Sequence, residues 1–284
     1  MLLSPTHSVS SFDHNKLECS FYSGAMICNY LMPACFALLP DHNEQTYTEL
    51  FKFLKAILES GPKRVVIDFE KAVFNSLQKT FEKVSITGCQ FHFFQNLRKN
   101  MAKKKALEIV TSNNDAKHFY DLIKSLIYVP PGFMIDFYQK TIIPFFDNKG
   151  LNKIPELVAF KLYFENTYIG KGKKKPVFHP DSWNMFHEIM NELSNTNNGL
   201  EQLNSQINQN LKAKNTIYTT IEIFQNETLY MEVKLKEIRE GSYVERNIGR
   251  KEERIKNKAD IKNVIMKFDH SSPMEFIKQI LNFV

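Results

Sequence analysis

The sequence predicts a mixed α/β fold, in which a mixed sheet flanked by helices is joined to a mainly helical region. Between about residues 16 and 104, short apolar runs alternate with helix-like stretches in the order β-β-α-β-α-β-α. Strands that are separated by a helix indicate a crossover connection and a parallel strand pair. From residue 105 to residue 195 the pattern turns helical and less regular.

Two apolar runs predict the first strands of the sheet. Residues 16–23 and 25–39 are strand-like, and Ser23-Gly24 between them is typical of a hairpin turn. Pro33 interrupts the second run. Because proline has no N–H to donate, we expect a bulge or an edge position there.

An amphipathic helix and two crossover units follow. The apolar residues between Tyr47 and Leu58 have the spacing of one helix face, and Gly61-Pro62 ends this helix. The elements expected after it are a strand over residues 64–68, a helix over 69–81, a strand over 84–88 and a helix over 92–104.

Composition narrows the class of protein. With 284 residues, 43% of them hydrophobic, the chain can build a sizeable core. Its net charge of +6 fits a polyanionic partner, and ordinary solubility explains it as well.

The four cysteines form no C-x-x-C pair, so no zinc ribbon is expected, and three of them have the apolar surroundings of free thiols in a reducing compartment. Because no apolar run approaches the roughly 18 residues that span a bilayer and no secretory signal is recognised, we expect an intracellular protein without a membrane partner.

An acidic residue ends the strand expected over residues 64–68. Asp68 follows the apolar run Val65-Val66-Ile67, and a carboxylate buried there without a partner is costly. A helix N-cap or a surface turn explains this acid simply. A ligand of a catalytic metal explains it too, and then further ligands must lie elsewhere in the chain.

A second acid lies beside the apolar stripe of a helix-like stretch. Glu201 falls in the first turn of this helix, and Asn197 and Asn198 just ahead of it are cap candidates rather than metal ligands. The helix dipole alone favours a glutamate there, so capping is the alternative to metal binding. The stripe consists of Leu200, Leu203, Ile207 and Leu211.

Four stretches in this order carry a resemblance to a known family. They are YLMPACFALLPDHNEQTYTELFKFL, VVIDFEKA with GCQFHFFQNL, LYFENTYIG before FHPDSWN, and NNGLEQLNSQIN. Together they resemble the transposase domain of Mutator-like elements (MULE), one of the RNase H-like DDE nucleases, over about residues 20–240. The resemblance implies an RNase H-like mixed sheet flanked by helices, with a mainly α-helical insertion before the last catalytic helix.

The same resemblance implies a magnesium-dependent enzyme that cuts and joins DNA. In this chemistry three carboxylates hold two divalent metals, and carboxylate-only sites suit Mg²⁺ or Mn²⁺. Asp68 matches the family's second Asp and Glu201 its final Glu, so these two residues are the expected metal ligands. DNA, as transposon ends and target, is the implied partner. A homodimer and a nuclear location are also implied.

The resemblance divides the chain into five parts. They are an irregular N-terminal segment (1–15), the first part of the RNase H-like core (16–104), the helical insertion (105–195), the C-terminal core helices with Glu201 (196–240) and a charged helical tail (241–284). We expect no counterpart of the zinc modules that accompany such domains.

One element of the family pattern is missing. Counting back from the Leu-Leu-Pro segment to the family's first Asp reaches His7 and Ser8, where no acid occurs. Asp13 and Glu18 are the nearest replacements, and Asp13 matches poorly in both sequence and spacing. Because the loss of one ligand removes charge and geometry together, we expect a truncated or degenerate, inactive transposase. The alternatives are a non-catalytic module that binds DNA or protein, and a gene fragment without function.

Cys89 and His92 form a C-x-x-H element after Asp68. No second pair at a useful spacing completes a zinc site, so packing or hydrogen bonding beside the active site is the preferred interpretation. His92 is a candidate for contact with the scissile phosphate, and a structural histidine is the alternative. Trp183 is interpreted as a core residue in preference to a base-stacking one.

Two basic clusters are candidates for contact with DNA phosphates. One lies at the end of the helix expected over residues 92–104, the other in a Gly/Lys loop, and a solvated surface explains each of them about equally well. Their members are Arg98, Lys99, Lys103, Lys104 and Lys105 in the helix, and Lys171, Lys173, Lys174 and Lys175 in the loop.

Overall fold

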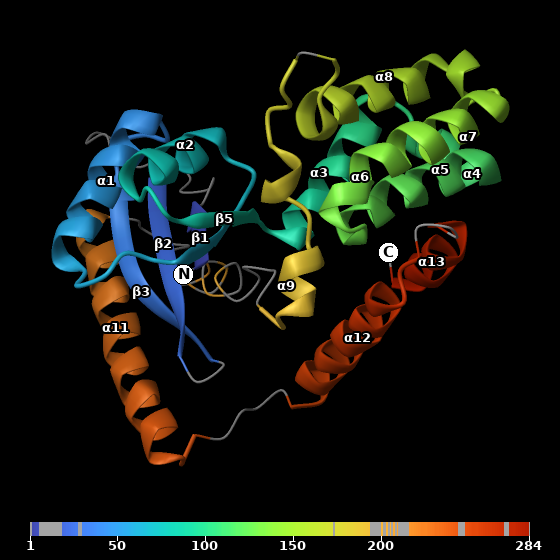
Figure 1. Ribbon diagram of the computed structural model, residues 1–284. Coiled ribbons are helices and arrows are strands. Elements are labelled where there is room, and N and C mark those ends of the chain that lie inside the picture. The colour runs from blue at the N-terminus through green and yellow to red at the C-terminus, as the bar shows by residue number, and fades with distance from the viewer. Residues whose placement is uncertain are drawn as a thin grey trace. The chain divides into compact units, whose positions relative to one another are not determined.

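The protein is a mixed α/β structure that divides into two compact units (Figure 1). Unit 1 comprises residues 1–89 and 196–246, and unit 2 comprises residues 90–195 and 247–284. The computed structural model describes residues 2–5, 19–27, 30–172, 174–193, 216–243, 248–269 and 273–283, together with residues 200, 203, 205, 207 and 209. The predicted fold class, a mixed α/β structure with a long helical region, is confirmed.

The described residues of unit 1 form a five-stranded sheet in the order β3-β2-β1-β4-β5. The strands are β1 (Leu2–Pro5), β2 (Cys19–Ile27), β3 (Tyr30–Leu39), β4 (Arg64–Ile67) and β5 (Ser85–Gly88). β1, β4 and β5 run parallel, whereas β2 is antiparallel to both β1 and β3, so the sheet is mixed and the predicted parallel pair is confirmed. β1 lies within the segment expected to be irregular (1–15). These four residues have no periodic pattern that would predict a strand. They are extended because they pair with β2 on one side and with β4 on the other.

The predicted hairpin turn at Ser23-Gly24 is wrong. Both residues are buried inside β2, which continues to Ile27. The register between β2 and β3 shifts at Ser23/Gly24 and leaves Ala34 as an extra residue in β3, which is a β-bulge. A glycine thus marks a bulge here and not a turn. The bulge beside Pro33, and the edge position of β3 among the described strands, agree with the prediction.

Helices cover both faces of the sheet in unit 1. On one face, α1 (Glu44–Ile57) and α2 (Lys71–Thr80) pack against Val65 and Ile67 of β4. On the other face, Val66 packs in a cluster with α11 (Ile217–Glu240) and the predicted apolar stripe. Successive residues of β4 therefore pack against opposite helical layers, as the two-residue period of a strand requires. The members of the second cluster are Val66, Cys89, Leu200, Leu203, Ile207 and Phe224.

Unit 2 is helical. Its elements are α3 (Gln90–Lys103), α4 (Leu107–Ser112), α5 (Asn114–Ser125), η1 (Leu126–Tyr128), α6 (Pro131–Phe137), η2 (Tyr138–Ile142), α7 (Ile143–Asn148), η3 (Leu151–Lys153), α8 (Pro155–Phe164), η4 (Glu165–Ile169), η5 (Pro180–Ser182), α9 (Phe186–Met190), α12 (Ile248–Met266), α13 (Pro273–Ile280) and η6 (Leu281–Phe283). Among the described residues, no helix combines the length and hydrophobicity that crossing a bilayer requires.

An aromatic cluster fills the core of unit 2. Trp183 is fully buried, and its indole N–H donates a hydrogen bond of 3.1 Å to the carbonyl oxygen of Tyr168. The ring of Phe93 stacks on the indole, with centroids 5.1 Å apart. The interpretation of Trp183 as a core residue is therefore confirmed.

We predict that Phe93→Ala destabilises unit 2 by about 3–5 kcal/mol, because it opens a cavity beside Trp183. Phe91→Ala, on the same helix but with a half-exposed ring, should change stability by less than about 0.5 kcal/mol. Urea unfolding followed by fluorescence measures both, since Trp183 is the chain's one tryptophan. Equal effects of the two variants would contradict the assignment of this core.

Candidate metal site at the end of β4

Asp68 lies at the carboxyl end of a central strand. It is the first residue after β4 and is half-buried. On one side, the N–H of Cys89 donates a hydrogen bond of 2.7 Å to the carbonyl oxygen of Ile67, which brings Cys89 level with Asp68. On the other side, Leu2 pairs with Val66, so Ser4 occupies the position in β1 level with Asp68. Carboxyl ends of parallel strands are where ligand-binding groups gather in α/β sheets.

The segment that carries Glu201 packs close to this strand end. Leu200 and Leu203 are buried in one cluster with Val66, two positions before Asp68, and with Cys89. Glu201 itself lies outside the described residues, as do Asn197 and Asn198. The described neighbours of Glu201 in the chain therefore pack beside the end of β4.

A close approach between Phe69 and Gly88 holds the chain next to Asp68. A Cβ atom at Gly88 would come within 2.3 Å of the Phe69 ring, which real side chains do not tolerate. Only glycine leaves room for this ring on the neighbouring strand. The packing of Phe69 therefore restrains the backbone on the helix side of Asp68.

The described residues contain no group of three His, Cys, Asp or Glu side chains able to hold a metal ion. Asp68 belongs to that part of the chain, whereas Glu201, Asp13 and Glu18 lie outside it. A serine, the residue type at position 4, has a neutral oxygen, which is a weaker ligand for Mg²⁺ than a carboxylate. Of the acids considered for the metal site, Asp68 is the one that belongs to the described part of the chain, and it lies at the end of β4.

The C-x-x-H element is divided between the two compact units. Cys89 is fully buried in the core cluster of unit 1, in agreement with the packing role expected of it. His92 lies on α3 of unit 2 and is partly exposed. Its interaction with a phosphate stays a prediction.

The basic cluster of α3 gathers where this helix ends. Lys105 has a left-handed backbone with a φ of 59°, and the N–H of Ala106 donates to the carbonyl oxygen of Met101 at 2.9 Å, which closes the helix. Arg98, Lys99, Lys103 and Lys105 are exposed, and Lys104 is partly exposed. Cations at a helix carboxyl end are favoured by the helix dipole, so the cluster has a local stabilising role besides any interaction with DNA.

The Gly/Lys loop forms a tight turn. The backbones of Lys171 and Lys174 exchange two hydrogen bonds of 3.0 Å, and Gly170 and Gly172 have positive φ angles of 88° and 59°. The turn exposes Lys171, Lys174 and Lys175. Lys173 lies outside the described residues.

Comparison with known proteins supports the resemblance found in the sequence. Residues 11–96 match the family model of the MULE transposase domain. The transposase for insertion sequence element IS256 in transposon Tn4001, from Staphylococcus aureus and from Enterococcus faecalis, is 31% identical to the chain over 71 residues. This match covers 25% of the chain and 18% of the relative's length, so the chain spans about a fifth of these relatives. No solved structure matches the chain significantly.

The family match includes one of the two predicted metal ligands. Asp68 and the C-x-x-H element lie within residues 11–96, and Glu201 lies beyond them. The resemblance to MULE transposases is thus confirmed for the strand that ends in Asp68. For the segment of Glu201 it stays a prediction.

We predict that Gly88→Ala destabilises unit 1 by roughly 1–3 kcal/mol, because the new methyl group displaces the Phe69 ring. Gly132→Ala is the matched control, since a Cβ there meets nothing within 4 Å, and it should change stability by less than about 1 kcal/mol. Thermal unfolding by circular dichroism measures both variants. Combining Gly88→Ala with Phe69→Ala should cost less than the sum of the two single effects. Additive effects would contradict the close approach of these two residues.

Proposed function

We propose that the chain is a transposase-derived domain of the RNase H-like DDE type, whose metal site has two carboxylates, Asp68 and Glu201, and lacks the third. The observation that carries the proposal is the position of Asp68 at the carboxyl end of β4, beside the packed neighbours of Glu201. In this way two acids far apart in the sequence come from elements that pack together in unit 1.

The architecture of unit 1 supports an RNase H-like fold. Three parallel strands, β1, β4 and β5, continue from an antiparallel pair, and helices cover both faces. The chain leaves this unit after Cys89 and returns at Thr196. Residues 90–195 of the helical unit 2 thus lie between the strand of Asp68 and the segment of Glu201, as the resemblance implies, and residues 247–284 of the same unit follow both.

The pairing of β1 with β4 supports the proposal that the family's first catalytic Asp has no counterpart here. β1 neighbours β4, and its residues Leu2 to Pro5 include no acid. Ser4 stands level with Asp68, where a carboxylate would complete a group of three. No acid precedes Asp13 in the sequence. We therefore propose that the chain is catalytically inactive as it stands.

In a complete site of this kind, bound Mg²⁺ or Mn²⁺ would activate the attacking oxygen and stabilise the leaving oxygen at a phosphodiester. Asp68 and Glu201 would hold the metal, and the packing of Phe69 on Gly88 would fix the backbone that carries Asp68. With two carboxylates in place of three, less negative charge is available to hold two cations. Metal binding should then be weak.

DNA is the proposed partner. The exposed cations at the end of α3 and in the turn of Lys171 and Lys174 can contact phosphates without reading base sequence. Nuclear location stays a prediction, and the relatives from Staphylococcus aureus and Enterococcus faecalis come from cells without a nucleus.

A second candidate function is a non-catalytic module that binds DNA or protein. The neutral residue at position 4 favours this function, because a fold that lacks one metal-binding carboxylate can still bind DNA or protein. The two functions differ in whether metal binding can be restored at the end of β4.

We predict that Ser4→Asp strengthens Mn²⁺ binding at least about tenfold, because it adds the third carboxylate. Ser4→Asn is the control of matched size without charge, and it should leave the affinity unchanged. Titration calorimetry measures each variant, with circular dichroism to show that it is folded. The gain should disappear when Ser4→Asp is combined with Asp68→Asn or with Glu201→Gln.

Two results would contradict this account. Unchanged Mn²⁺ affinity in a folded Ser4→Asp variant would show that position 4 is not part of the site. Cleavage of DNA by the unmodified chain with Mg²⁺, abolished by Asp68→Asn, would show that another acid completes the site and that the domain is active.

We predict that Lys103→Gln with Lys105→Gln weakens binding to duplex DNA and lowers the slope of log affinity against log salt by about 1.8, since each of the two phosphates that the lysines neutralise contributes roughly 0.9. Lys52→Gln with Lys83→Gln removes two exposed cations from unit 1 and is the control. Fluorescence anisotropy over a range of salt concentrations measures both slopes. Equal slopes would assign the α3 cluster to helix capping alone.

A further inference from the structure

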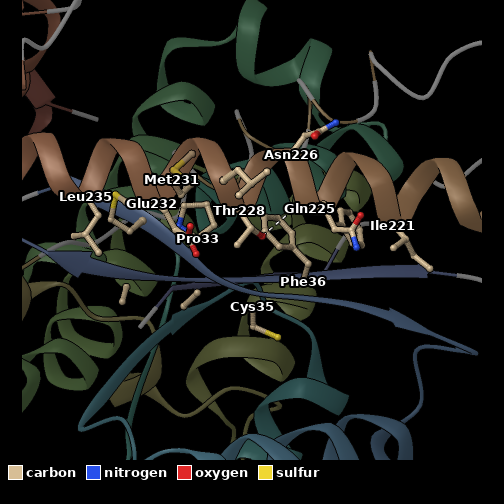
Figure 2. A pocket seen from close by; sticks show the side chains of 15 residues that line it. Pro33, Cys35, Phe36, Ile221, Gln225, Asn226, Thr228, Met231, Glu232 and Leu235 are labelled. Atoms are coloured by element: carbon tan, nitrogen blue, oxygen red, sulfur yellow. Dashed lines mark hydrogen bonds between the residues drawn. The ribbon is translucent and has the colours of Figure 1, made fainter.

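The two long helices α11 and α12 are each held to their unit at few points. α11 buries Thr220 and Phe224 in unit 1, and beside them a groove of about 920 Å³ lies open between α11 and β3 (Figure 2). Among the described side chains of α12 in unit 2, Ile265 alone is buried. Helices with few buried apolar contacts open at a lower free energy than the core of a domain.

An apolar anchor joins the segment after α12 to unit 2. α13 contacts α5 and buries three apolar side chains, Phe276, Ile277 and Ile280. The ring of Phe276 packs edge-on against Phe268, with centroids 4.9 Å apart, and the ring of Phe268 lies 5.6 Å from that of Phe133 in α6. We call α12, α13 and η6 together the C-terminal strap. The strap follows unit 1 in the sequence but belongs to unit 2.

α9 ends in a left-handed turn, at a position that glycine usually occupies. Glu192 has a φ of 57°, and its N–H donates to the carbonyl oxygen of Ile189 at 3.1 Å. The N–H of Leu193 donates to the carbonyl oxygen of Glu188 at 2.8 Å. This pair of bonds is the Schellman motif, whose left-handed residue is most often glycine. A residue with a Cβ atom is strained in this conformation, so a contact from outside α9 is needed to hold Glu192 there.

Two lysines of α12 make that contact. Lys262 Nζ lies 2.6 Å from Glu192 Oε1, and Lys258 Nζ donates to the carbonyl oxygen of Leu193. The hydrogen bond from Lys262, together with the charge of Lys258, lowers the pKa of the Glu192 carboxyl group. Because the Glu192 side chain is 73% exposed, this ion pair is weak on its own and depends on the α13 anchor to bring α12 into place.

We propose that the C-terminal strap docks reversibly, and that its docking locks the left-handed turn of Glu192 and Leu193. In the docked state the strap supplies the two cations that offset the strain at Glu192. When the strap undocks, both cations leave, and Glu192 returns to the negative φ that residues with a Cβ atom prefer. The strap and the turn therefore open together, as one unit.

The locked turn precedes the second proposed metal ligand in the sequence. Glu201 follows Leu193 by eight positions. Control of the Glu201 segment by the strap rests on the proposed function, whereas the docking and the lock do not. The test of the strap uses no metal, so the two proposals can fail separately.

Hydrogen exchange of the full chain, resolved to single amides by NMR, tests the proposal. In the unmodified chain we expect the amides of α12 and of Leu193 to exchange through one opening, with less protection than the amides of α8, which belong to the core of the same unit. Ile277→Ala should speed exchange at α12 and at Leu193 by the same factor, about 30-fold or more, because it removes buried contacts of the anchor. Met274→Ala changes an exposed residue of α13 and is the matched control, with an effect of less than about twofold.

Glu192→Gly tests the lock itself. Glycine keeps a φ of 57° without strain, so the turn should hold without the strap. When Ile277→Ala is added to Glu192→Gly, exchange at α12 should still speed up, but exchange at Leu193 should change by less than about twofold. Glu192→Gln keeps the strain and removes the ion pair, and it should speed exchange at both places by about two- to fivefold. Circular dichroism shows that each variant is folded.

Three results would overturn the proposal. Amides of α12 that are as strongly protected as those of α8 would show that the strap does not undock by itself. An exchange rate of Leu193 that Ile277→Ala leaves unchanged would show that the strap does not lock the turn. Equal acceleration of Leu193 by Ile277→Ala, with and without Glu192→Gly, would show that backbone strain is not the lock.

Discussion

Burial of one apolar stripe against β4 holds unit 1 together. Leu200, Leu203 and Ile207 come from a part of the chain that follows the whole helical insertion, and they pack on Val66 and Cys89. Full burial of three such side chains contributes roughly 5–9 kcal/mol as an upper estimate. This is comparable to the net stability of an ordinary domain. The return of the chain to the sheet is therefore stabilised by this packing, and it brings an acid-bearing segment to the strand end of Asp68.

Much of this arrangement can be predicted from the sequence, because it follows from periodicity. The strand before Asp68, the helices on both sides of it and the stripe of Leu200 all have regular apolar spacing. β1 cannot be predicted from periodicity, because its four residues have no alternating apolar pattern. They form a strand through pairing with β2 and β4 on either side. The glycine at position 24 is misleading for a related reason. A glycine in an apolar run suits a turn and a bulge equally, and pairing with β3 decides between them.

The site itself is only partly predictable. Asp68 is recognisable because an acid at the end of a buried strand needs an explanation, whereas Gly88 carries no such signal in the sequence. Its role depends on the Phe69 ring of a different element, so it becomes visible only in three dimensions. The serine level with Asp68 is also hidden in the sequence, because the register of β1 against β4 has to be known first.

α11 covers the second face of the sheet. Its inner face completes the layer that contains Val66, through Phe224. Its outer face mixes exposed apolar side chains such as Leu229 with charged ones such as Glu222 and Lys236.

The claim on which this account depends is that Asp68 and Glu201 meet at one metal. Cleavage of the backbone by bound Fe²⁺ with ascorbate and peroxide tests it most directly, because the radicals cut only near the ion. We predict two cuts in the same chain, one near residue 68 and one near residue 201, both suppressed by excess Mg²⁺ and by Asp68→Asn. A cut near only one of the two positions would show that these acids do not share a site.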